Sequence, residues 1–204
     1  MSVLAIDVRR RPMSWWWAPA VAGVVALLAR PWFLPAGVAV EWRVAFFVAL
    51  GATGLAWRQN FFASPTATKT RRSGTPNDPA GWAISLAVLG VGALAFALGR
   101  AVVDVPVRPS GLAVAVGLNA LAAVAEEAFF RRYLYGLVVE RYGTVLAVAV
   151  TAVAFALVHV TVWGWWVLPL DVAAGLVLSW QRAATGRWSV PAATHVLANT
   201  FALL

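Results

Sequence analysis

Seven polar side chains in the second half of the chain have types that do chemistry and lie within apolar stretches. They are Asn119, Glu126, Glu127, His159, Asp171, His195 and Asn199. His159 and His195 are the only histidines of the chain. An ionisable group inside a long apolar segment is costly and marks a functional site by default. Glutamate and histidine together can activate a water molecule or relay a proton.

Two adjacent glutamates head the segment Glu126-Glu127-Ala-Phe-Phe-Arg131. On a helix, Glu127 and Arg131 are i,i+4 neighbours and can form an ion pair. Glu126 points about 100° away from Glu127 and is left without a local partner. An unpaired carboxyl group in a low-dielectric environment favours its neutral form, which suits a general base near neutral pH.

The two histidines are predicted to meet this glutamate pair. A turn is expected near Tyr142–Gly143, so Glu126 and His159 reach the same level in an antiparallel helix hairpin. His195 lies about 12 Å beyond the basic edge at Arg187, and Glu126 about 8 Å before Arg131. These three groups are expected to meet about one third of the way into a bilayer, nearer the cytoplasm.

Composition predicts the elements that position these residues. The chain has 204 residues, of which 62% are hydrophobic and 12% charged, and its mean hydropathy is +0.79. These values exclude a soluble enzyme, a disordered tail and a repeat solenoid, and the absence of cysteine excludes a disulfide scaffold. We therefore predict an all-α, polytopic membrane bundle of about seven transmembrane helices with an intramembrane active-site cavity. The expected spans are Trp15–Leu34, Val38–Trp57, Ala80–Gly99, Gly111–Tyr135, Gly143–His159, Trp165–Gln181 and Trp188–Leu204. Gly164 and Pro169 are expected to break helices between the fifth and sixth spans.

Charge predicts the orientation. The net charge is +8, and with a cytoplasmic N-terminus twelve of the 16 basic residues lie inside and four, Arg30, Arg43, Arg100 and Arg108, lie outside. This bias explains the basic character without nucleic acid, which we do not expect as a partner. We expect a multi-pass protein of the cytoplasmic membrane with the bilayer as its partner. The composition, with a single lysine, is typical of a high-GC bacterium.

The chain is expected to form one membrane domain in two parts. Residues 1–110 hold the N-terminal helices and a basic cytoplasmic loop at 58–79, and residues 111–204 hold the candidate site residues. Asp171 either pairs with a site histidine or lines the cavity, and Asn119 is expected to line the same cavity.

Three motifs on the apolar segments resemble the CPBP family of intramembrane endopeptidases, which includes the type II CAAX prenyl endopeptidases. The motifs are EExxxR at 126–131, FxxxH at 155–159 and HxxxN at 195–199. The resemblance covers residues 111–204 and implies that this part of the chain is the catalytic core. It implies that Glu126 activates the attacking water, that His159 orients it, and that Arg131 holds Glu127. It further implies that His195 and Asn199 stabilise the oxyanion. The substrate would be a membrane-associated protein or peptide.

Metal use stays open at this point. His159, His195 and Glu126 could hold zinc with an open position for water. The HExxH spacing is absent, however, and we slightly favour a metal-free glutamate mechanism. Two other functions compete with proteolysis. The first is a non-catalytic membrane protein of the same fold, acting in bacteriocin self-immunity or partner binding. The second is a small transporter or proton-coupled channel.

Overall fold

The described part of the chain is helical and contains no strand. The computed structural model describes residues 14–35, 37–56, 79–102 and 111–203. Its elements are α1 (Ser14–Phe33), α2 (Val40–Ala56), α3 (Pro79–Val102), α4 (Leu112–Glu127), the π-helix η2 (Ala128–Leu134), α5 (Tyr135–Trp163), the 3₁₀ turn η3 (Trp165–Val167), α6 (Leu168–Thr185) and α7 (Ser189–Leu203). The predicted basic loop and the predicted boundary near residue 110 lie outside the described residues.

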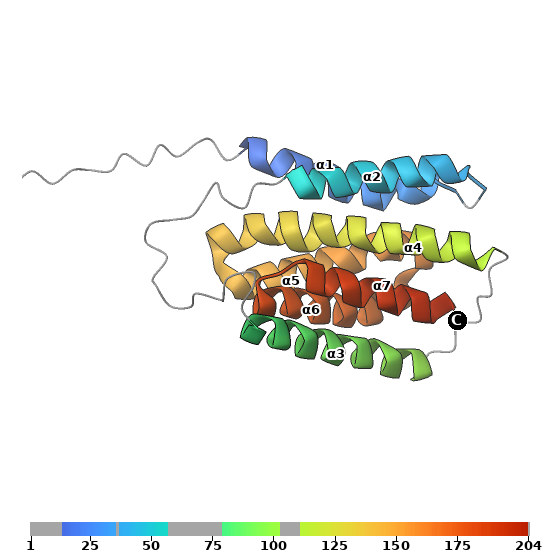
Figure 1. Cartoon of the computed structure of the whole chain (residues 1–204). Coiled ribbons are helices and arrows are strands. Elements are labelled where there is room, and N and C mark those ends of the chain that lie inside the picture. The colour runs from blue at the N-terminus through green and yellow to red at the C-terminus, as the bar shows by residue number, and fades with distance from the viewer. Residues whose placement is uncertain (1–13, 36, 57–78, 103–110, 204) are drawn as a thin grey trace, which may run out of the picture.

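The helices lie lengthwise in one bundle. Helices α4 to α7 form its middle, α1 and α2 cover one side, and α3 covers the opposite side (Figure 1). α5 packs against α6, and α4 packs against α7. On the covering sides, α2 contacts α4 and η2, α1 contacts α5, and α3 contacts α6 and α7.

The hairpin that the sequence predicts is present inside α5. Gly143 has φ 81° and ψ 174°, so the chain turns there between two helical arms. A positive φ is accessible to glycine at little cost because it has no Cβ. The turn therefore lies where the sequence placed it, and α4, η2 and the first arm of α5 run antiparallel to the second arm.

The expected helix breaks after this hairpin are half correct. Gly164 ends α5 with φ 88°. Pro169 lies in the first turn of α6 and does not break a helix, since proline lacks an N–H that this position would leave unsatisfied anyway. α5 ends at Trp163, one turn beyond His159.

Glycine permits the closest helix contacts near the centre of the bundle. A Cβ on Gly175 of α6 would lie 2.8 Å from Ala152 Cα in α5. A Cβ on Gly54 of α2 would meet the backbone of Ala128 in η2. Small residues at such contacts let helix backbones approach closely in a membrane, where packing replaces the hydrophobic effect as the driving force.

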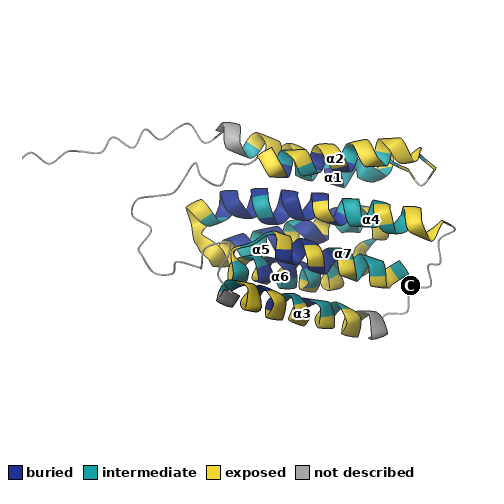
Figure 2. Cartoon of the chain, viewed as in Figure 1, coloured by how far each residue is buried: buried dark blue, intermediate teal, exposed yellow. Residues whose placement is uncertain are grey.

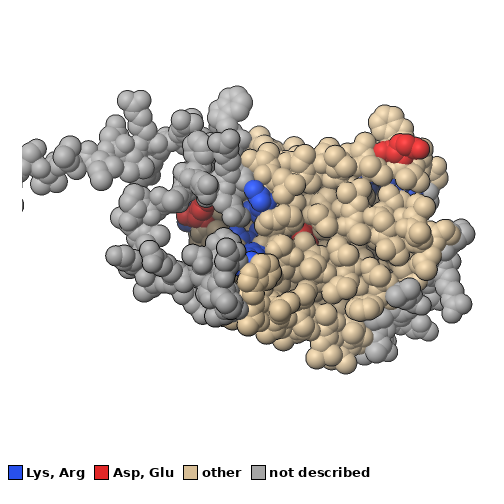
Figure 3. Space-filling model, viewed as in Figure 1, with Lys and Arg blue, Asp and Glu red and all other residues tan. Residues whose placement is uncertain are grey.

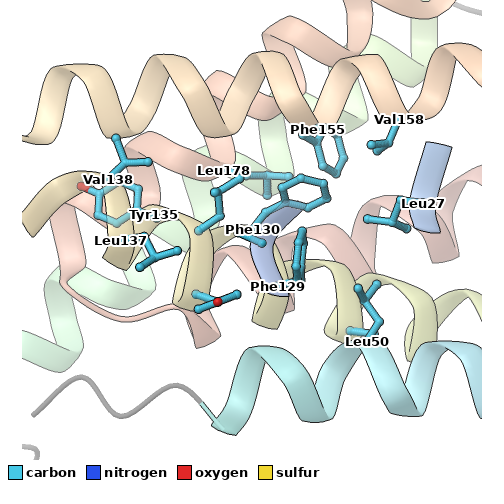
Figure 4. Close-up of a cluster of buried hydrophobic side chains, with 14 of the residues drawn as sticks. Leu27, Leu50, Phe129, Phe130, Tyr135, Leu137, Val138, Phe155, Val158 and Leu178 are labelled. Carbon is cyan, nitrogen blue, oxygen red and sulfur yellow. The ribbon is translucent and has the colours of Figure 1, made fainter. Parts of the chain in front are cut away.

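Aromatic and aliphatic side chains fill the space between these helices. Phe129 and Phe130 of η2 are fully buried, and Phe155 from α5 and Leu178 from α6 pack beside them (Figure 4). The rings of Phe130 and Phe155 meet edge to face with centroids 5.7 Å apart. This core surrounds η2, the segment that directly follows the two glutamates.

The outer surface of the bundle is strongly apolar. Large hydrophobic side chains are exposed along the outer faces of α1, α2 and α3, among them Val25, Val48, Leu86 and Leu94 (Figure 2). In the view of Figure 3, charged side chains gather toward the two ends and the surface between them is largely uncharged. An apolar surface of this extent suits lipid and not water.

By length and composition, the described helices include two that could cross a membrane, Gly81–Gly99 and the continuous stretch Leu112–Trp163 that holds the hairpin. Trp17–Phe33 is apolar but shorter. The all-helical class is thus confirmed for the described residues, whereas the count of seven spans and the cavity stay predictions.

Candidate active site

Glu126 and His159 face each other across the hairpin. Glu126 lies in the last turn of α4 and His159 in the second arm of α5, and their atoms Oε2 and Nε2 are 3.7 Å apart. That distance is too long for a direct hydrogen bond and short enough for one water molecule to contact both atoms. The Glu126 side chain is 4% exposed and that of His159 13%. The predicted meeting of these two residues is therefore confirmed.

The other nitrogen of His159 is already engaged. Nδ1 lies 2.8 Å from the carbonyl oxygen of Phe155, one turn earlier on the same helix. Because a carbonyl oxygen only accepts, Nδ1 carries the hydrogen, and Nε2 of the neutral ring presents its lone pair toward Glu126. Asp171 Oδ2 of α6 also approaches Nδ1, at 4.0 Å, and is buried without a hydrogen-bond partner among the described residues. Asp171 thus lies beside a site histidine.

Glu127 joins Arg131 to His195. Its Oε1 accepts a hydrogen bond from Arg131 Nη1 at 2.8 Å, so the predicted i,i+4 pair is present. The same oxygen lies 3.0 Å from His195 Nδ1. An ionised carboxylate only accepts, so His195 Nδ1 donates, and this contact leaves Nε2 unengaged. The Arg131 and Glu127 side chains are both fully buried.

The π-helix holds Arg131 in the centre of the bundle. Arg131 Nη2 donates to the Gly175 carbonyl at 3.3 Å, which the close approach of α6 permits. Its guanidinium carbon lies 4.5 Å from the ring centroid of Phe155. The Arg131 carbonyl in turn accepts a 3.0 Å hydrogen bond from Arg182 Nε. π-helical turns are rare and often occur at functional sites, and this one follows the glutamate pair directly.

Arg30 is the site residue that sequence reasoning missed. Glu126 has no partner on its own helix, as expected, but Arg30 of α1 donates from Nη1 to Glu126 Oε1 at 3.1 Å. By sequence, Arg30 counts among the basic residues on the outer side, near the end of the first expected span, Trp15–Leu34. The structure places it inside α1, within the last turn. Glu126 is therefore paired, and the expectation of an unpaired carboxyl group is wrong, because the packing of α1 brings an arginine to it.

Neither Asn119 nor Asn199 forms a hydrogen bond with another candidate site residue among the described residues. Asn199 lies one turn after His195 on α7, is half-buried, and forms no side-chain hydrogen bond with the described residues. Asn119 donates to the Ala115 carbonyl of its own helix at 2.8 Å. The role of Asn199 in the site and the lining role of Asn119 stay predictions.

One groove of about 490 Å³ is lined by α1 and α2 residues and by the segment between these helices, and none of the candidate site residues lines it.

The donor set does not fit a metal centre. Among the described residues, no three His, Asp or Glu side chains gather closely enough to hold a metal ion. Arg30 already places a positive charge on Glu126 Oε1, and His195 Nδ1 is held by Glu127. A zinc site needs about four ligands near 2 Å. The chemistry of this arrangement is therefore derived from the chain's own residues.

Residues 108–201 match the family described as type II CAAX prenyl endopeptidase Rce1-like. No curated protein and no solved structure matches the chain. The resemblance to the CPBP family is thereby confirmed: the chain carries an Rce1-like domain over α4 to α7. This match supports, at the level of the family, an intramembrane endopeptidase and an integral membrane protein. The match begins after α3, so α1 and Arg30 lie outside it.

Proposed function

We propose that the chain hydrolyses a peptide bond of a membrane-associated protein or peptide, with Glu126 and His159 activating the attacking water. The observation that carries this proposal is the 3.7 Å approach of Glu126 Oε2 to His159 Nε2. Both atoms are acceptors when His159 is neutral. A water molecule between them donates both of its hydrogens, which leaves an oxygen lone pair free to attack a carbonyl carbon.

The proposed reaction has two steps, addition of water and cleavage of the carbon–nitrogen bond. The water oxygen bonds to the carbonyl carbon as its proton moves to Glu126, and the carbonyl oxygen becomes an oxyanion. The carbon–nitrogen bond then breaks as Glu126 returns that proton to the leaving amine. The products are a new carboxyl terminus and a new amino terminus. His159 stays fixed through the Nδ1 contact with the Phe155 carbonyl.

His195 and Asn199 are proposed to stabilise the oxyanion. His195 Nε2 donates whenever it carries a hydrogen, and the contact of Nδ1 with Glu127 Oε1 holds the ring in place. Asn199 shares its helix face at i,i+4 and offers an amide donor. Donors that are already oriented stabilise a developing negative charge without reorganisation. Glu127 and Arg131 are proposed to fix the position of His195.

Arginine–aromatic pairs at one end of the bundle support the proposed membrane placement. Arg187 lies 4.4 Å from the Trp82 ring, Arg182 5.3 Å from Tyr135, and Arg132 5.9 Å from Trp188. Basic and aromatic side chains are typical of the cytoplasmic membrane interface. Along α7, His195 lies about 12 Å beyond Arg187. A cytoplasmic N-terminus of the chain in the cell membrane is therefore part of the proposal. With that orientation, the contact of Glu126 with Arg30 in the last turn of α1 lies toward the outer end of that helix, and the expected position of the site nearer the cytoplasm is not proposed again.

The test compares cells that express the native chain with cells that express Glu126→Gln. Mass spectrometry of new protein termini in the membrane and secreted fractions would name the substrate. Glu140→Gln is the matched control, because it removes a carboxylate at the other end of the same hairpin. We expect termini that occur with the native chain and the control and disappear with Glu126→Gln. Identical termini in all three, at equal expression, would favour the non-catalytic binding or immunity function.

A further inference from the structure

Arg30 is a charged residue within an apolar membrane helix, and its partner lies 96 residues further along the chain. α1 consists of mostly apolar residues from Ser14 to Phe33. A charged side chain within an apolar membrane helix is costly, so such residues typically have a partner and a function. Arg30 meets this condition through the 3.1 Å contact with Glu126.

The contact determines which carboxylate oxygen faces the histidine. Arg30 Nη1 contacts Oε1 of Glu126, while Oε2 lies toward His159 Nε2. A side-chain carboxylate that is held at one oxygen by a guanidinium keeps the other oxygen in a fixed direction. Arg30 therefore orients the oxygen that is proposed to take the proton from water.

Charge balance gives Arg30 a second effect. Two adjacent carboxylates are buried at this level, and each has one arginine. Arg131 pairs with Glu127 and Arg30 pairs with Glu126. If Arg30 were absent, His159 would be the one remaining cationic partner that contacts Glu126 among the described residues. A protonated His159 has no lone pair at Nε2 to accept a hydrogen from water.

Packing from α2 keeps Arg30 in place. The guanidinium carbon of Arg30 lies 6.0 Å from the ring centroid of Phe47 in α2. The Arg30 side chain is 14% exposed. Residues of α1 and α2 thus bring a cation to the glutamate at the end of α4.

From this geometry we infer that Arg30 is a positioning residue of the active site, which holds Glu126 with its Oε2 toward the water. The catalytic unit consequently includes α1 in addition to the Rce1-like domain. This inference rests on the proposed function. It adds a residue from outside the family match to the machinery of that site.

The test measures kcat and KM of the purified full chain in lipid vesicles, on the substrate that the comparison of protein termini identifies. Arg30→Gln removes the charge, and we expect kcat to fall about 10- to 100-fold while KM changes less than threefold, because an effect on the base alone acts on the chemical step. Arg30→Lys keeps the charge. We expect its kcat to lie above that of Arg30→Gln by at least a third of the loss in log kcat that Arg30→Gln causes. Arg43→Gln is the control, since Arg43 lies on α2 and donates to the Pro35 carbonyl.

The outcomes separate this inference from the proposed function. If the native chain cleaves and Glu126→Gln does not, while Arg30→Gln is as active as Arg43→Gln, the role of Arg30 is overturned alone. Faster cleavage by Arg30→Gln also overturns it, because Arg30 would then restrain the base. If neither the native chain nor any variant cleaves, the proposed function fails. Thermal unfolding in detergent separates misfolding from catalysis. If Arg30→Gln unfolds at a lower temperature than the native chain, Arg30→Lys decides the question. A folded Arg30→Lys that loses as much kcat as Arg30→Gln would overturn the role of the charge.

Discussion

Oε1 of Glu127 lies 3.0 Å from Nδ1 of His195, although 68 residues separate them in the chain. The same oxygen accepts from Arg131 Nη1 at 2.8 Å. One buried carboxylate atom thus connects η2 to α7 and holds the His195 ring in place. The Glu127 side chain is fully buried, so its charge has no access to water.

Removing the Glu127 charge should destabilise the fold. Glu127→Gln leaves Arg131 buried without an ionic partner, and the loss of one member of a buried pair typically costs about 3–5 kcal/mol. The double variant Glu127→Gln/Arg131→Met should be more stable than the single variant, because it removes both charges. Thermal unfolding in detergent micelles measures both. A Glu127→Gln midpoint equal to that of the native chain would contradict the importance of this pair.

The proposed oxyanion donors should affect the rate more than substrate binding. Asn199→Ala is expected to lower kcat about 10²–10³-fold, as does the loss of one preorganised oxyanion donor in other hydrolases. Thr200→Val is the matched control, because the Thr200 hydroxyl donates to Val196 of its own helix. A steady-state assay in lipid vesicles gives kcat and KM. A loss below threefold for Asn199→Ala would remove this residue from the site.

Replacing the imidazole ring of His195 should lower kcat. His195→Gln keeps a polar side chain but removes the imidazole ring. That ring donates from Nδ1 to Glu127 and leaves Nε2 as the proposed oxyanion donor. We expect kcat to fall at least 10²-fold with the fold retained. Circular dichroism and thermal unfolding check the fold. Activity near the native level would show that the contact between Glu127 and His195 is structural alone.

The contact between α5 and α6 should tolerate no side chain at Gly175. A Cβ there would lie 2.8–2.9 Å from Ala152 backbone atoms. Gly175→Val should separate the two helices, weaken the Arg131 contact with the Gly175 carbonyl, and lower both the unfolding midpoint and the activity. Gly90→Ala in α3 is the control, since its Cβ would meet nothing within 4 Å. Equal stability of the two variants would show that the contact can relax.

The sequence predicted the site where local spacing determines the geometry. The i,i+4 pair of Glu127 and Arg131 follows from helical periodicity, and the turn at Gly143 brings Glu126 level with His159. The three motifs pointed to the family that residues 108–201 match.

The contacts that sequence could not predict depend on tertiary packing. Arg30 contacts Glu126 because α1 packs against α5 and η2. The sequence periodicity of α1 does not indicate which helix it packs against. The π-helical turn likewise gives no signal in the hydrophobic pattern, since Ala128 to Leu134 fit an ordinary helix as well. An arginine one turn from the end of an apolar span was the signal available for Arg30.

The most direct test of the account is the ratio of kcat/KM for the native chain and Glu126→Gln, both purified, folded and reconstituted in lipid vesicles with the same substrate. The proposed role of Glu126 as the base predicts a loss of about 10²–10⁴-fold, with Glu140→Gln at the native level. A Glu126→Gln variant that retains more than a tenth of the native kcat/KM would contradict water activation by Glu126 and His159.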